Sequence, residues 1–237
     1  AASDVYKRQK PVIVLKAGRT ARGVRAAASH TGSLAGSYEV FSGALKQAGA
    51  ILVNDLQELL IAIKILKTGW RVNGKNVAII TNGGGAGVMA TDAIESMGLR
   101  VADLSSDIIE KLRNTLPPAA SPYNPVDVLG DAPAERYRKA LEIVSKDPNV
   151  DMIMIIALMQ SPALDANELV KVLSEMKKQT KHPLVFVAPG GTYTLHYIGE
   201  IQQNGIPAFR DSVEAAKALR FLYDYSINVA RVQRKTI

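Results

Sequence analysis

The sequence predicts an α/β protein made of two flavodoxin-like units with doubly wound parallel sheets, the first of them truncated. Short apolar, β-branched runs alternate with segments of helical periodicity, which is the pattern of parallel sheets covered by helices. A glycine-rich turn lies between a strand and a helix in both halves of the chain. With 237 residues, the chain is long enough for one large or two small domains.

The composition excludes several classes of site and partner. The chain has no cysteine, so disulfides and thiolate chemistry are excluded, and its three histidines lack ligand-like spacing, so we expect no metal site. The net charge of +7 favours anionic ligands such as nucleotides, phosphate or coenzyme A. No basic run is interleaved with aromatic residues, and no apolar run spans a membrane. We therefore expect a cytoplasmic protein that binds neither nucleic acid nor membrane.

The first region, residues 10–70, predicts too little structure for a complete domain. Residues 1–9 resemble the translation of a transposon end used in sequencing libraries, and we expect them to be a non-native scar. Strands are predicted at Pro11–Leu15 and Ala50–Val53, followed by a helix to about Lys67 that a capping box opens. Two parallel strands give too little core, so this region reads as the back half of a domain.

A histidine among small residues stands out in this region. His30 lies within Ala26–Gly36, ahead of a predicted helix for which Thr31 or Ser33 would be the N-cap. A helix start favours an anion, and a nucleophilic imidazole beside it can carry a phosphoryl group. The alternative is a histidine that merely packs in a loop. The preceding loop carries arginines that either face solvent or meet ligand phosphates; they are Arg19, Arg22 and Arg25.

The second region, residues 75–231, follows a predicted boundary at 69–75 and has the cleaner pattern. The predicted strands are Val77–Thr81, Leu99–Asp103, Met152–Leu158, Leu184–Ala188 and Ile206–Phe209. Helices are predicted near 86–97, 107–114, 132–146, 165–180, 194–204 and 211–231. A proline-rich loop over Pro117–Asp131 is long for a connection, and long ordered loops at strand ends are often functional.

The turn over Asn82–Thr91 joins a strand to a helix, and its glycines let backbone amides approach an anion. One interpretation is a dinucleotide fingerprint formed by Gly85, Gly87 and Ala90, with Asp103 as the ribose-binding acid. A second interpretation is a phosphate site of another kind. A third is a tight turn needed only for close packing of helix on strand.

Three segments together resemble the ADP-forming acyl-CoA synthetases, such as acetate-CoA ligase, which are relatives of succinyl-CoA synthetase. They are Ser29–Gly36, Asn82–Thr91 and Ser121–Gly130, in the expected order. The resemblance implies that residues 10–70 are the C-terminal half of the phosphohistidine-bearing domain. It also implies that 75–231 form the following ligase-CoA domain and that 232–237 are a tail.

The resemblance also implies which residues form the site. His30 would be the catalytic residue that carries the phosphoryl group. The phosphate-binding residues would be Thr31, Gly32, Ser33, Gly83, Gly84, Gly85, Ala86 and Gly87. Asn124 and Asp127 are further candidates near the phosphate, although Asn and Asp among prolines also stabilise turns.

The implied reaction interconverts acyl-CoA, ADP and phosphate with a carboxylic acid, CoA and ATP. Its substrates would be coenzyme A, ATP or ADP, and phosphate, with magnesium in an ATP-grasp domain. Turnover would require that domain and a CoA-binding domain, and the parent enzyme would be an oligomer. Two alternatives remain open at this point, namely a dinucleotide-binding oxidoreductase domain and a non-catalytic, synthetase-like regulatory module of a protein acetyltransferase.

Overall fold

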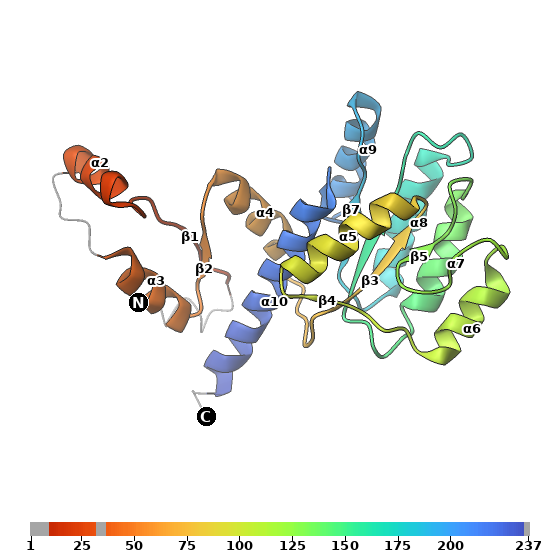
Figure 1. Ribbon diagram of the computed structural model, residues 1–237, viewed down its shortest axis with the longest axis horizontal. Coiled ribbons are helices and arrows are strands. Elements are labelled where there is room, and N and C mark those ends of the chain that lie inside the picture. Colours follow the sequence, from red (N-terminus) through yellow and green to blue (C-terminus); the bar gives the residue numbers. More distant parts are fainter. Residues whose placement is uncertain (1–9, 32–36, 235–237) are drawn as a thin grey trace. The chain divides into compact units, whose positions relative to one another are not determined.

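The computed structural model describes residues 10–31 and 37–234, with the side chains of residues 30, 31 and 232–234 excepted. The chain divides into two compact units, and Figure 1 labels helices and strands along it. Unit 1 comprises Ala1–Lys67 with Phe221–Ile237, and unit 2 comprises Thr68–Arg220. The expected scar at 1–9 lies outside the described residues. None of the described helices is long and apolar enough to cross a membrane.

Unit 1 contains a two-stranded parallel sheet in which Ile13 pairs with Ile51 and Leu15 with Val53. Its elements in chain order are β1 (Ile13–Leu15), α2 (Ala21–Thr31), α3 (Tyr38–Gln47), β2 (Ile51–Val53) and α4 (Leu56–Leu66). The capping box that predicted α4 is present, because the Asp55 carboxylate accepts a hydrogen bond from the Glu58 amide at 2.7 Å. The Glu58 carboxylate in turn accepts from the Asn54 amide at 2.8 Å.

The helices around His30 differ from the sequence prediction. The expected basic loop is helix α2, which Thr20 opens by accepting a hydrogen bond from the Gly23 amide at 3.1 Å. The alanines before His30 have high helix propensity and extend this helix through Thr31. Thr31 is therefore not an N-cap, and α3 begins at Tyr38 with Ser37 as its cap. Ser33, the other expected cap, lies outside the described residues.

Unit 2 contains a six-stranded, fully parallel sheet with the strand order β4-β3-β6-β7-β8, and β5 also pairs with β3. Its strands are β3 (Asn76–Thr81), β4 (Arg100–Val101), β5 (Val126–Asp127), β6 (Met152–Ile156), β7 (Leu184–Val187) and β8 (Ala208–Phe209). Its helices are α5 (Gly84–Ser96), α6 (Ser106–Thr115), α7 (Ala134–Val144), α8 (Ala166–Gln179), α9 (Thr192–Gln203) and the first turns of α10 (Ser212–Arg234). This architecture confirms the predicted α/β class.

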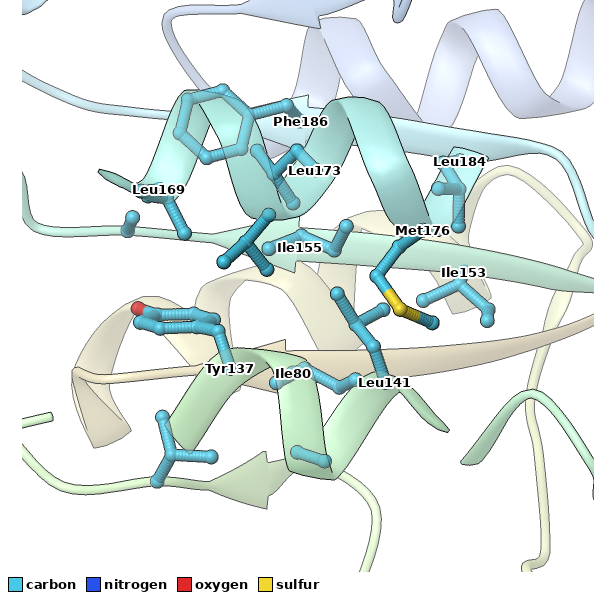
Figure 2. Packing of buried hydrophobic residues seen from close by; sticks show 14 of the residues in the cluster. Ile80, Tyr137, Leu141, Ile153, Ile155, Leu169, Leu173, Met176, Leu184 and Phe186 are labelled. Carbon is cyan, nitrogen blue, oxygen red and sulfur yellow. The ribbon is translucent and has the colours of Figure 1, made fainter. Parts of the chain in front are cut away.

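The central strands of unit 2 are buried on both faces, which explains their continuous apolar sequence. Ile153 and Ile155 of β6 belong to the large core beneath α7 and α8, and Met154 between them points to the opposite face. Figure 2 shows Leu141 from α7 and Leu173 from α8 in this core; Ile80, Tyr137, Leu169, Met176, Leu184 and Phe186 are labelled around them.

One edge of β3 is shared by two short strands. β4 pairs with its first half through Asn76 and Val77, and β5 pairs with its second half through Ile80 and Thr81. The Asn124 side chain fills the interval: its Oδ1 accepts from the Ile79 amide at 2.8 Å, and its Nδ2 donates to the carbonyls of Val77 and Ala102 at 2.9 Å each. One side chain thus satisfies the Ile79 amide and the Ala102 carbonyl, and it gives the Val77 carbonyl a second donor beside the Ala102 amide at 2.9 Å.

Candidate functional site

The candidate site in unit 2 lies where β3 ends and α5 begins, at the carboxyl edge of the parallel sheet. Gly83 is the N-cap of α5 and supplies no side-chain hydrogen bond to the first amides. The Thr81 hydroxyl holds the turn by accepting from the Gly83 amide at 3.0 Å. Gly84 and Gly85 are exposed. The start of α5 therefore presents backbone N–H groups without a side-chain cap, which suits an anion.

Gly85 and Gly87 in this turn have different surroundings, and so they have different roles. A Cβ at Gly85 would meet no atom within 4 Å, so the backbone there is open to a ligand. A Cβ at Gly87 would lie 3.1 Å from the Thr81 methyl and 3.2 Å from Cβ of Pro125. Gly87 is therefore required for close packing of α5 against β3 and the loop before β5. The packing interpretation of the turn holds for Gly87, and Gly85 is left free for binding.

Asp127 places a carboxylate beside the same helix start. Its Oδ2 would be 3.2 Å from a Cβ at Gly84, and its Oδ1 accepts a hydrogen bond from the Leu129 amide at 2.9 Å. A phosphate at Gly84 would be repelled by this carboxylate. The open approach for an anion to the first turn of α5 is therefore from the side of Gly85.

Buried polar side chains hold this edge of the sheet in place. The Asn82 side chain bridges to the end of β6 by accepting from the Leu158 amide at 2.8 Å, and it is 2% exposed. The Tyr137 hydroxyl donates to the carbonyl of Ile156 at 2.9 Å. Burial raises the pKa of Tyr137 well above its ordinary value, and the nearby Asp127 charge raises it further. The loops around the site are thus tied to the strands.

The structure distributes the sequence-predicted residues over both units. The start of α5 brings together Gly83 to Gly87 and Asp127. The side-chain amide of Asn124 instead forms hydrogen bonds with backbone groups of the sheet. His30 lies in the last turn of α2 in unit 1, and its side chain is outside the described set, as is that of Thr31. Gly32 and Ser33 lie outside the described residues. Their assignment to a phosphate site stays a prediction.

Two positioning residues escaped the sequence analysis. Tyr137 lies within the expected helix near 132–146, and nothing in a helical pattern shows that its hydroxyl reaches a strand carbonyl. Asn82 was noticed only as the first residue of a glycine turn. The available signal was a polar residue directly after a buried strand, a place where side chains often organise the carboxyl edge of a sheet.

Comparison with known proteins identifies the family of both regions. Residues 1–66 match the model of the succinyl-CoA ligase like flavodoxin domain, and residues 77–232 match the Ligase-CoA domain. The chain belongs to the Ligase-CoA domain family. The resemblance noted in the sequence is thereby confirmed, and so are the flavodoxin-like units.

Similar proteins include an ADP-forming acetate–CoA ligase I of Archaeoglobus fulgidus, 40% identical over 92% of this chain and 31% of its own. The alpha subunit of an ADP-forming acetate–CoA ligase I of Pyrococcus furiosus is 40% identical over 95% of this chain and 48% of its own. A solved acetyl-coenzyme A synthetase 1 of Ca. Korarchaeum cryptofilum, in complex with phosphate and ADP, has a TM-score of 0.89 and 31% identity. The match extends over 100% of this chain and 51% of the solved chain.

The chain spans between about a third and a half of the length of these relatives. The relatives therefore contain further regions that have no counterpart in these 237 residues.

Proposed function

We propose that this chain is the part of an ADP-forming acyl-CoA ligase that carries the phosphoryl group on His30 and binds it at the start of α5. The observation that carries the proposal is the tandem match to both ligase domains, with the Ser29–Gly36 motif in the first and the glycine turn in the second. The relatives named as ADP-forming acetate–CoA ligases support the same activity, with CoA, ADP and phosphate as substrates.

In the proposed reaction, phosphate attacks the thioester carbonyl of acyl-CoA, and CoA leaves as the thiol to give an acyl phosphate. The His30 imidazole then attacks phosphorus, the P–O bond to the acyl group breaks, and the carboxylate leaves. ADP finally takes the phosphoryl group from the imidazole and becomes ATP. Each transfer passes through a transition state with charge spread over three phosphoryl oxygens, which fixed N–H donors stabilise.

The described part of the chain offers such donors at α5. The amides of the first turn have no side-chain cap, and the backbone at Gly85 is open. The Asp127 carboxylate would disfavour an anion close to Gly84 and so confine the phosphoryl group to the Gly85 side. No cluster of three His, Asp or Glu side chains suited to a metal lies among the described residues. In this proposal magnesium belongs to the ATP-grasp domain.

The partners follow from the same proposal. A CoA-binding domain and an ATP-grasp domain, in the same chain or in a second subunit, would complete an oligomeric cytoplasmic enzyme. The family match favours this ligase over a dinucleotide-dependent oxidoreductase. An intact His30 motif favours it over a regulatory module without turnover.

Labelling of the assembled enzyme with γ-³²P-ATP tests the proposal. Acid-labile, alkali-stable label should appear on His30, and His30→Ala should abolish both label and turnover. His182→Ala and His196→Ala are matched controls that should retain both, because His182 contacts the backbone carbonyl of Ser145 and His196 lies beside Glu200 on the surface of α9. Full turnover in His30→Ala would refute the mechanism.

A separate variant tests the proposed binding of the phosphoryl group at the start of α5. Gly85→Val places a branched side chain where the anion would approach, and a Cβ there meets no protein atom. We expect slower labelling of His30 with unchanged affinity for CoA. A collapse of CoA affinity with normal labelling would refute the assignment of the α5 start to phosphate.

A further inference from the structure

A cavity of about 490 Å³ opens in unit 2 on the face of the sheet that carries α5 and the start of α10. It lies at the carboxyl ends of β6 and β7, on the Met89 face of α5. Its lining consists of one face of α5 and the segment that leads into α10; the residues that carry the argument are Met89, Asp92, Ala93, Ile156, Arg210 and Val213.

The body of this cavity is apolar. Its floor includes the last residues of two central strands, Ile156 and Val187, which are 1% and 2% exposed. Its walls include Met89 and Val213, whose side chains are 63% and 51% exposed although they are large and hydrophobic. Cavities of 300–1,000 Å³ with mostly apolar walls and a few polar groups are typical of small-molecule sites.

The lining of the cavity includes one positively charged side chain, Arg210, and two negatively charged ones, Asp92 and Asp211. The Arg210 guanidinium and the Asp92 carboxylate form no hydrogen bond or ion pair with any described residue, and they form none with each other. Asp211 also lines the cavity, but its Oδ1 is occupied at the start of α10, where it accepts from the Glu214 amide at 2.9 Å. A guanidinium and a carboxylate are therefore available to opposite charges on one ligand.

We propose that this cavity binds a neutral α-amino acid with a large apolar side chain. The side chain occupies the apolar body above Ile156, the carboxylate pairs with Arg210, and the ammonium group pairs with Asp92. A simple anion fits less well, because the two aspartates and one arginine give the lining a net negative charge. A zwitterion complements both available charges. The proposal does not rest on phosphoryl transfer at His30, and Ala86, one of the residues predicted to bind phosphate, also lines the cavity.

Binding of three probes to the full chain tests the inference. L-phenylalanine carries both charges, phenylacetate lacks the ammonium group, and 2-phenylethylamine lacks the carboxylate. NMR titration should show amide shifts at Ala93, Ile156 and Val213, with each of the singly charged probes binding about tenfold more weakly than phenylalanine. Equal binding of all three probes would overturn the assigned chemistry, and absence of phenylalanine binding would overturn the site.

Variants locate each charge without relying on the loss of binding alone. In Arg210→Gln, phenylalanine and 2-phenylethylamine should bind equally, because the ligand carboxylate has lost its partner. In Asp92→Asn, phenylalanine and phenylacetate should bind equally. Arg100→Gln, a change at an exposed arginine away from the cavity, should leave the tenfold preference intact. A preference that survives both cavity variants would refute the assignment.

An adjacent pair of residues on α5 supplies the steric control. Met89 lines the cavity and Val88 does not, yet the two side chains are 63% and 62% exposed. Met89→Trp should block phenylalanine binding, whereas Val88→Trp should leave it unchanged. Equal effects of the two tryptophans would place the binding elsewhere on the molecule and refute the proposal.

Discussion

The two glycines Gly85 and Gly87 should respond in opposite ways to the same added methyl group. Both lie in α5, where alanine has a higher helix propensity than glycine by up to about 1 kcal/mol. Gly85→Ala adds a Cβ that meets no atom within 4 Å, so only the propensity term acts. We expect a gain of about 0.4–1 kcal/mol in the free energy of unfolding of unit 2.

Gly87→Ala adds the same Cβ between two neighbours that have little room to move. The Thr81 methyl would lie 3.1 Å away on a buried strand, and Cβ of Pro125 would lie 3.2 Å away on a rigid ring. Overpacking of this kind costs about 1–3 kcal/mol, which exceeds the propensity gain. We therefore expect a net loss of about 1 kcal/mol, and a difference of about 2 kcal/mol between the two variants.

Hydrogen exchange at the amides of β3 measures this difference within unit 2, because these amides lie in its most buried strands. A difference of about 2 kcal/mol corresponds to about a thirtyfold difference in the exchange rate of globally protected amides. Urea unfolding should rank the variants in the same order, Gly85→Ala above the unsubstituted protein and Gly87→Ala below it. Equal stabilities for the two variants would refute the packing argument for Gly87.

Two further changes probe the scaffold of the site. Asn124→Ala should lower the stability of unit 2 by about 2–3 kcal/mol in urea unfolding, because it leaves the Ile79 amide and the Ala102 carbonyl without their partner, while the Val77 carbonyl keeps its hydrogen bond from the Ala102 amide; a loss below about 1 kcal/mol would contradict this. Tyr137 should make the fold less stable as pH rises above its ordinary pKa of 10.0, because the unfolded chain ionises there while burial keeps the folded phenol neutral. Tyr137→Phe should flatten that alkaline loss in urea midpoints measured between pH 8 and 11, and an unchanged slope would show that other groups cause it.

The sheet of unit 2 was predictable from the sequence because its strands are buried on both faces. A continuous apolar run such as Met152–Ile156 admits few other environments in a chain with alternating helical segments. The glycine turn was predictable for a similar local reason, since three adjacent glycines after a strand favour close approach of the backbone. In unit 1 the local sequence pattern led to a wrong prediction for the segment before His30, which is helix α2. The segment with Arg19, Arg22 and Arg25 was expected to be a loop, but most of it is helical because the alanines that follow have high helix propensity.

The features that escaped prediction depend on contacts between distant residues. Strand β5 is two residues long and lies inside a proline-rich loop, so only its pairing with β3 defines it. The proximity of Asp127 to Gly84 depends on that pairing. The cavity joins Met89 to Arg210, which are more than 100 residues apart, and no local periodicity relates them.

The proline-rich loop performs two tasks along one strand, β3. Asn124 reaches back to the first half of β3 and satisfies backbone groups there. Three residues later Asp127 pairs with Thr81 at the end of β3 and brings its carboxylate to the start of α5. The same segment therefore closes the edge of the sheet and sets the charge at the candidate phosphate site, so changes within it should affect stability and anion binding together.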